Sequence, residues 1–327
     1  MTRFPDGLHE FLREAGWADA AIDPLPGDAS FRRYFRLRDA GRAAMLMHAP
    51  PPQEDPKPFL DVAGYLAAQG MRVPAIHHAE TEAGWVLLED FGDHRMRDWL
   101  DVRPGDERAA YEAAVDALAM LHTRPPGPFG RYDLETYLAE VRLLTRWYAP
   151  AAGLSVDEEA HEAAWRTVLA PLLPRQEPGV TVLRDYHAEN IMLLCGRPGA
   201  PQGLIDFQDA LVGHPAYDLV SLLQDARRDV SHALEVSMLD RYCATRGAGD
   251  DFRADYARLG AQRNAKIVGI FTRLAKRDGK PGYLSMIPRV WEAMERDLAH
   301  PALEPVARWF DANIPIELRR ARGGEIA

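Results

Sequence analysis

The chain reads LRDYHAENIM at residues 183–192 and GLIDFQD at residues 203–209. Each stretch follows or contains a short apolar run that is typical of a β-strand. Asp185 is followed five positions later by Asn190, and Asp206 lies just past the next strand. In phosphoryl-transfer enzymes one Asp accepts the proton of the attacking hydroxyl, while an Asn and a second Asp hold the magnesium ions that bridge the nucleotide phosphates. We therefore predict a phosphoryl-transfer centre with Asp185 as the base and with Asn190 and Asp206 as the metal ligands.

The same spacing has a purely structural alternative. Asp185 and Asn190 could form an Asx-type turn, and Asp206 could cap a loop. We favour the catalytic interpretation because both stretches end strands, occur in the expected order and have helical sequence behind them. Magnesium usually takes only one or two oxygen ligands from a protein, so one amide and one carboxylate suffice.

Further stretches resemble the aminoglycoside-phosphotransferase family, the small-molecule branch of the protein-kinase-like fold. The chain is most similar to its anomeric sugar kinases of bacterial cell-wall recycling, which phosphorylate N-acetylmuramate and N-acetylglucosamine at the C1 hydroxyl. The stretches that carry the resemblance are LRDYHAENIM together with GDASFRRYFRL from Gly27, LMHAPPPQED from Leu46, LLEDFGD from Leu87, the run from Leu204 to Asp229, and QRNAKIVGIFTRLAKRDGKPGYL from Gln262. The resemblance implies Mg2+ as the cofactor, ATP as co-substrate and an amino sugar as acceptor.

The implied fold is α+β and two-lobed, with a small, mostly antiparallel β N-lobe and a larger helical C-lobe. We place the nucleotide-binding lobe at residues 1–90 and the helical lobe, with the catalytic loop, metal site and acceptor pocket, at residues 91–327. Periodicity agrees with this division, since the first part predicts a helix over 4–16, a hairpin over 31–49, a helix over 59–68 and a strand over 85–88. Helices are predicted in the second part over 106–121, 134–147, 157–169, 215–225, 232–246, 253–276, 287–298 and 303–312.

The loop before the basic strand is a candidate for the phosphate-binding turn. By resemblance we assign a phosphate contact to Ser30, supported by Arg32 or Arg33; from the residues alone an ordinary hairpin entry fits equally well. Family members carry a Lys on the third strand that pairs with the phosphates. Residues 44–48 contain none, so an Arg of the preceding strand or Lys57 replaces it, or metal and backbone suffice.

The stretch LLED at residues 87–90 resembles the hinge that binds adenine through main-chain groups. We therefore assign Glu89 and Phe91 to the nucleotide. By resemblance Asp218 accepts backbone N–H groups of the catalytic loop and so fixes Asp185. Asp225, on the same helix face, is expected to be solvated.

The acceptor side is assigned from position. Gln208 and Asp209 follow the metal ligand directly, and His187 lies inside the catalytic loop, where a loop-stabilising hydrogen bond is the alternative to a substrate contact. Arg184 is assigned to the acceptor as a partner for a carboxylate.

The helix predicted from residue 253 supplies a second set of acceptor candidates. Gln262, Lys266 and Arg273 lie on one stripe with Gly269 among them, which we interpret as a sugar-binding wall; a solvated charged face is the alternative. Arg263 or Arg273 could also pair with the lactyl carboxylate of muramate.

Composition excludes several classes of protein. The 327 residues carry a formal net charge of -10, which argues against a nucleic-acid surface. The N-terminus shows no signal peptide, and no run reaches the length of a membrane span. Cys195 and Cys243 are too few for a disulfide framework and are expected to be two buried thiols. We therefore expect a cytoplasmic protein without membrane or nucleic-acid partners.

Two other functions fit the same motif. One is a kinase for another small acceptor, of aminoglycoside, choline or homoserine type, but cationic acceptors call for a carboxylate-rich pocket, and residues 263–280 are basic. The other is a non-catalytic nucleotide-binding module, which the missing strand Lys would explain.

Overall fold

The N-terminal sheet has five antiparallel strands in the order β1-β2-β3-β5-β4. The computed structural model describes residues 4–26, 31–324 and 326. The strands are β1 (Ala21–Pro24), β2 (Arg33–Asp39), β3 (Arg42–His48), β4 (Ile76–Glu80) and β5 (Trp85–Glu89). Residues 40 and 41, which join β2 to β3, both have positive φ, as tight hairpin turns require.

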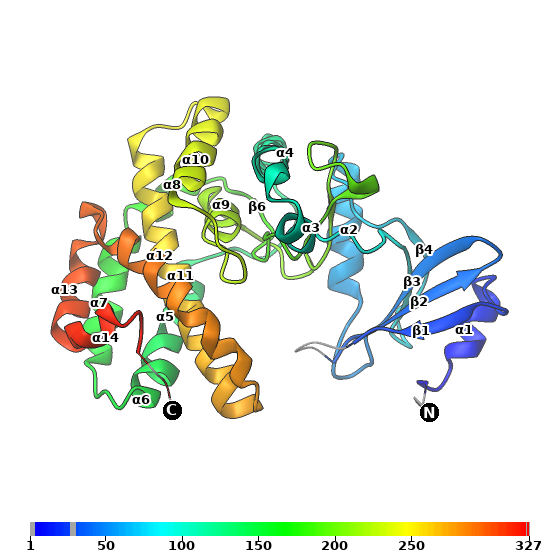
Figure 1. The fold of residues 1–327 in the computed structure, drawn as a ribbon, viewed down its shortest axis with the longest axis horizontal. Helices are drawn as coiled ribbons and strands as arrows, with labels where there is room; N and C mark the ends of the chain where they lie inside the picture. The colour runs from blue at the N-terminus through cyan, green and yellow to red at the C-terminus, as the bar shows by residue number, and fades with distance from the viewer. Residues whose placement is uncertain (1–3, 27–30, 325, 327) are drawn as a thin grey trace.

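Side chains alternate between the two faces of this sheet. Leu46 and Leu87 pack against α1 (Leu8–Glu14) on one face, whereas Met47 and Val86 pack into the cluster of α2 (Lys57–Ala68) on the other. Figure 1 shows α2 on the side of the sheet that faces the rest of the molecule and α1 on the outer side. The sheet is therefore buried on both faces, which explains why β3 and β5 read as continuous apolar runs.

The larger lobe is helical and is organised around the 29-residue α11 (Asp250–Asp278), which packs against α5, α9 and α12. Its longer helices are α3 (Met96–Val102), α4 (Glu107–Leu121), α5 (Leu134–Leu143), α7 (Glu158–Leu169), α9 (Ala216–Leu223), α10 (His232–Arg246), α12 (Ile287–Leu298) and α13 (Glu304–Asn313). The short helices are α6 (Ala149–Ala151), α8 (Leu172–Arg175) and α14 (Ile316–Arg320), with a π-helical turn at Leu144–Tyr148 and 3-10 turns at Pro104–Asp106, Leu194–Gly196, Pro281–Met286 and Pro301–Leu303.

Two small ribbons bring the functional stretches together. β6 (Val180–Val182) pairs with β9 (Leu211–Gly213), and β7 (Ile191–Met192) pairs with β8 (Gly203–Leu204). The loop that carries Asp185 and Asn190 therefore runs from β6 to β7, and β8, which pairs with β7, leads into Asp206. This is the arrangement that the sequence predicts around residues 183–192 and 203–209.

Arg36 ties the sheet to the connection between the lobes. Its Nε lies 2.7 Å from Asp90 Oδ2, its Nη1 lies 2.7 Å from Asp93 Oδ1, and its Nη2 donates to the Gly92 carbonyl at 3.2 Å. The basic side chain predicted on the second face of β2 thus holds the segment between β5 and α3.

The predicted fold class is confirmed: an antiparallel sheet precedes a helix-rich lobe. The helices predicted at 232–246 and 287–298 have those limits in the structure. The helix predicted over 134–147 instead changes to a π-helical turn at Leu144, and strands β1 and β4 were not predicted. Both are short edge strands with mostly exposed side chains, so they lack the apolar alternation of a buried strand.

Neither cysteine is in a disulfide, but the expectation of two buried thiols is wrong for Cys195, which is exposed. Cys195 lies in a turn with φ of 56°, where the chain is at the surface. Of the helices in the described residues, none has the length and apolarity that crossing a membrane requires.

Candidate active site

Asp218 of α9 anchors the start of the loop after β6. Its carboxylate accepts the backbone N–H of Leu183 at 2.6 Å and that of Arg184 at 2.8 Å. Burial raises the pKa of Asp218 to about 7, while the two N–H donors and the charge of Arg263 act in the opposite direction. Asp218 therefore makes the contacts that the resemblance implies, one residue before Asp185.

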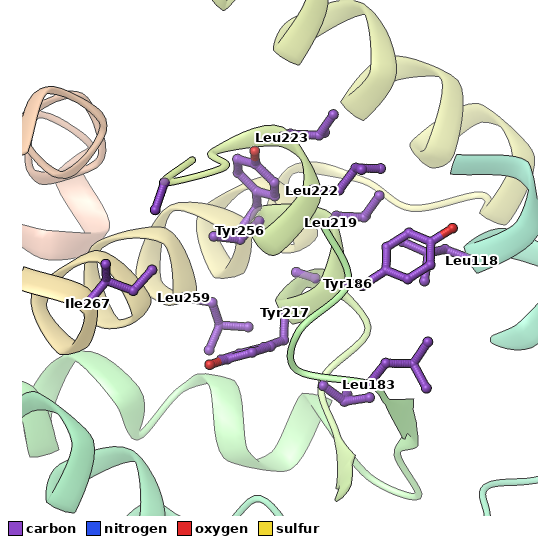
Figure 2. Packing of buried hydrophobic residues seen from close by; sticks show 14 of the residues in the cluster. Leu118, Leu183, Tyr186, Tyr217, Leu219, Leu222, Leu223, Tyr256, Leu259 and Ile267 are labelled. Carbon is purple, nitrogen blue, oxygen red and sulfur yellow. The ribbon is translucent and has the colours of Figure 1, made fainter. Parts of the chain in front are cut away.

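The loop is also packed into the hydrophobic core of the C-lobe. Figure 2 shows Leu183 and Tyr186 among buried side chains that include Leu118 of α4 and Leu219 of α9. The Tyr186 hydroxyl donates to the Ala114 carbonyl at 2.9 Å. The backbone on either side of Asp185 is thus held by buried contacts.

Asp185, Asn190 and Asp206 meet where the two loops adjoin. The Asn190 amide nitrogen donates to the Asp185 carbonyl at 3.0 Å and to Asp206 Oδ2 at 3.4 Å. Because its nitrogen is used in this way, its Oδ1 is the atom that can face a cation. Asp206 has φ of 61°, in the left-handed region, so the backbone turns sharply at this carboxylate.

The surroundings of Asp206 suit a cation. Although 45% of its side chain is exposed, partial desolvation by the surrounding protein raises its pKa. Gln208, which donates to Oδ1 at 3.0 Å, lowers the pKa, and the charge of Asp185 raises it again. A divalent ion would offset this repulsion between carboxylates. In the described residues no group of three or more His, Cys, Asp and Glu could hold a metal, so an ion here would depend on water and phosphate oxygens, as magnesium usually does.

His187 lies beside Asn190 and Arg227 rather than facing an acceptor. It is buried, and its Nε2 lies 3.4 Å from Asn190 Nδ2 and 3.3 Å from Arg227 Nη1. The Arg227 guanidinium can only donate, so Nε2 accepts and the neutral ring carries its proton on Nδ1. Burial lowers the pKa of His187 to about 3. The predicted substrate contact does not fit this position, whereas the loop-stabilising alternative does.

Arg32 reaches from the N-lobe to the metal ligand. Its Nη2 lies 3.7 Å from Asp206 Oδ1, and its Nε lies 4.0 Å from Glu54 Oε2, just before α2. Arg33 faces elsewhere, with its guanidinium 5.2 Å from the centre of the Phe35 ring. Ser30 lies outside the described residues.

Side-chain contacts show which groups of the predicted hinge could contact a nucleotide. Glu89 is paired with both Nη atoms of Arg72, and it also accepts the Ala75 N–H at 3.2 Å, so its carboxylate is not directed at a nucleotide. The Arg72 guanidinium stacks 4.7 Å from the centre of the Phe91 ring. A Cβ on Gly203 would lie 2.6 Å from that ring, so this glycine lets β8 approach the hinge. Any adenine contact here would be made by main-chain atoms or by the Phe91 ring.

The acceptor candidates divide into two groups. Gln208 and Asp209 lie beside the metal ligand, and Asp209 is exposed. Arg263 is buried behind the loop, where Nη2 donates to Ser221 Oγ at 2.8 Å and that hydroxyl donates to the Arg184 carbonyl at 3.2 Å. The predicted substrate contact of Arg263 is therefore corrected: it buttresses the loop from inside.

The proposed gap at Gly269 is also corrected. A Cβ there would lie 2.3 Å from the carbonyl carbon of Leu143, so the backbone of α5 fills the space that we assigned to a sugar. Gln262 is buried and donates to Glu140 at 3.0 Å. Of the stripe, Lys266 and Arg273 remain partly exposed.

Two acidic residues near the loop differ from the sequence-based predictions: Asp225 was expected to be solvated, and Glu140 was not among the predicted site residues. Asp225 is buried and accepts the Ala188 N–H at 3.2 Å and the Arg227 N–H at 2.8 Å, so the expected solvation is wrong. Asp225 follows Asp218 by seven residues and so lies on the same face of the predicted helix, which could have indicated that it also faces the loop. Glu140 was not singled out, although an acid on the apolar face of a predicted helix breaks the pattern of a buried face.

Comparisons with known proteins agree with this geometry. Residues 21–260 match the model of the phosphotransferase enzyme family, APH. An N-acetylmuramate/N-acetylglucosamine kinase of Caulobacter vibrioides is 38% identical over 95% of this chain and 96% of its own. A kinase of the same name from Pseudomonas aeruginosa is 38% identical over 89% of each chain. The ADP-bound crystal structure of the aminoglycoside phosphotransferase APH(2'')-Ib is similar in fold, with a TM-score of 0.62 at 14% identity over 94% of this chain and 99% of that one.

The family match thus includes the sheet and both stretches at residues 183–192 and 203–209, and the relatives align over nearly their whole length. The chain belongs to the phosphotransferase enzyme family.

Proposed function

We propose that this protein is an ATP-dependent kinase that phosphorylates the anomeric C1 hydroxyl of N-acetylmuramate, N-acetylglucosamine or both. The observation that carries the proposal is the meeting of Asp185, Asn190 and Asp206. It occurs in a chain 38% identical to kinases named for these two sugars.

In the proposed reaction Asp185 orients the sugar hydroxyl and accepts its proton as the oxygen attacks the γ-phosphorus of ATP. A bond forms between that oxygen and phosphorus, the bond to the β–γ bridging oxygen breaks, and ADP leaves. Asn190 Oδ1 and the Asp206 carboxylate would hold Mg2+, which neutralises phosphate charge when bound. The fixed loop supplies most of the rate enhancement by positioning and electrostatics.

Arg32 is our candidate for the cation that replaces the missing strand Lys. In protein kinases that Lys pairs with a Glu of a helix and with the nucleotide phosphates. Arg32 lies between Glu54, which precedes α2, and Asp206, so it has an acidic partner and lies near the proposed metal site. With Ser30 and the main chain near Phe91, it would form the nucleotide site between the lobes.

The reaction consumes ATP, and both cysteines are free thiols, so we place the protein in the cytoplasm. There its product would enter amino-sugar salvage from peptidoglycan.

The proposal is tested by measuring ADP release with N-acetylmuramate, N-acetylglucosamine, an aminoglycoside, choline and homoserine as acceptors. We expect turnover with one or both sugars, and phosphorus NMR of the product should show an anomeric phosphate ester. Phosphorylation of the amines with both sugars inert would assign the enzyme to another acceptor. Nucleotide binding without turnover of any acceptor would support a non-catalytic module.

A further inference from the structure

A cluster of charges surrounds Glu140 of α5, next to the start of the catalytic loop. Glu140 Oε1 accepts from Arg184 Nη2 at 2.7 Å and from Lys266 Nζ at 2.8 Å. Its Oε2 accepts from Gln262 at 3.0 Å and from the hydroxyl of Tyr132. We call Glu140, Arg184 and Lys266 the Glu140 cluster.

The cluster contains two cations and one anion. Burial acts to raise the pKa of Glu140, but Lys266 and Arg184 outweigh it and lower the pKa, so the carboxylate is ionised. Burial acts to lower the pKa of Lys266, but Tyr217 and Glu140 outweigh it and raise the pKa, so the ammonium is charged. Within the described residues no second carboxylate lies within ion-pair distance of Arg184 or Lys266. One positive charge is therefore left over in a poorly solvated place.

The two cationic side chains of the cluster are partly exposed to solvent. The side chains of Arg184 and Lys266 are 24% and 15% exposed, whereas Arg263 is buried behind the loop. Arg184 Nε is buried without a hydrogen-bond partner in the part of the chain that the structure describes. Lys266 uses two of its three N–H donors, on Glu140 and on the Tyr217 hydroxyl at 3.1 Å. Lys266 therefore has one N–H donor that no described residue uses, and Arg184 has a buried one.

The cluster lies next to the proposed base in the chain. Arg184 directly precedes Asp185, so their Cα atoms are about 3.8 Å apart. Figure 2 shows the Tyr217 ring below Leu259 of α11, with its oxygen directed away from Leu183 of the loop. Lys266, which belongs to α11, and Arg184, which belongs to the loop that carries the proposed base, meet at Glu140 Oε1.

We propose that Arg184 and Lys266 form a subsite for the carboxylate of an acidic acceptor sugar. This inference depends on the proposed function, because N-acetylmuramate carries a lactyl carboxylate that N-acetylglucosamine lacks. A guanidinium and an ammonium are the donors that bind a carboxylate by charge-assisted hydrogen bonds. Glu140 holds both cations in place and cancels half of their charge, so a neutral sugar is not excluded.

The test compares the two sugars in the same enzyme. Lys266→Met should lower kcat/KM for N-acetylmuramate about tenfold or more, mainly through KM, and leave N-acetylglucosamine within about twofold. Lys266→Arg should retain the wild-type ratio of the two values. Lys276→Met, at an exposed position on the same helix, is the matched control and should change neither.

Glu140→Gln provides a second change at the same cluster. It removes the charge that holds Arg184 and Lys266 in place, so it should shift the ratio of kcat/KM values away from N-acetylmuramate, as Lys266→Met does. Equal losses for both sugars in Lys266→Met, or no shift in Glu140→Gln, would overturn the carboxylate subsite. Failure of the wild-type enzyme to turn over either sugar would instead overturn the proposed function.

Discussion

Gly269→Ala should destabilise the C-lobe, because α11 and α5 touch at this glycine. An added Cβ would lie 2.3 Å from the carbonyl carbon, 2.4 Å from the oxygen and 2.6 Å from the Cβ of Leu143. Carbon atoms in contact sit about 3.5–4 Å apart, so the helices would have to separate by roughly 1 Å. Overpacking of this kind costs about 1–3 kcal/mol, and backbone atoms cannot rotate away. Ala is favoured over Gly in a helix by about 1 kcal/mol, which offsets part of this cost. If overpacking costs about 3 kcal/mol, the free energy of unfolding should therefore fall by about 2 kcal/mol.

The free energy of unfolding is measured from urea denaturation followed by circular dichroism. The matched control is Gly64→Ala in α2, where nothing lies within 4 Å of the added Cβ, and it should stabilise by about 0.5–1 kcal/mol. The two substitutions are thus expected to differ in sign. Lys266 lies three residues before Gly269, so a displaced α11 should also lengthen its 2.8 Å contact with Glu140 and raise KM for N-acetylmuramate. Stabilisation by Gly269→Ala would refute the close contact.

Four further predictions concern the site. Asp206→Asn should remove the Mg2+ dependence of nucleotide binding in titration calorimetry; an unchanged metal effect would exclude Asp206 as a ligand. Arg32→Met should lower kcat about 10- to 100-fold, with partial recovery in Arg32→Lys; wild-type kcat would show that another cation serves the phosphates. Asp218→Asn should lower kcat at least about tenfold with ATP affinity preserved, since the amide NH2 would face a backbone N–H; unaffected turnover would remove its positioning role. Because the pKa of Asp206 is raised, it protonates at a higher pH than an ordinary Asp, so the apparent KM for Mg2+ should rise as pH falls. Gln208→Leu removes a donor that lowers the pKa of Asp206, so the rise in the apparent KM for Mg2+ should begin at a higher pH. An unchanged pH dependence would contradict this effect of Gln208.

Much of the fold could be predicted from local sequence patterns. The hairpin of β2 and β3, helix α2 and the long helices of the C-lobe all have apolar residues at the period of their element. The edge strands could not be found in this way, because β1 and β4 bury little and carry no alternation. The close contact of Leu143, where α5 ends, with Gly269 could not be predicted either, because the two residues lie far apart in the sequence.

The candidate site was predictable where its residues are close in the chain. Asp185 and Asn190 belong to one loop, and β7–β8 pairing brings in Asp206. The role of Arg263 was wrongly predicted because its partner is distant: it binds Ser221, 42 residues away. The pairing of Arg184 with Glu140, 44 residues away, could not be predicted for the same reason. Sequence spacing does not show which long side chains turn inward, since this depends on acids contributed by other helices.

The role of Asp185 as the base is tested most directly by the Asp185→Asn variant. Its turnover and its ATP binding are measured in the same preparation. We expect kcat for the sugar acceptor to fall at least about 100-fold, because the amide of Asn cannot accept the proton of the attacking hydroxyl. ATP affinity should stay within about twofold of wild type, since Asn190 and Asp206 are untouched. Turnover near the wild-type rate would contradict the assignment of Asp185, and with it the phosphoryl-transfer centre described above.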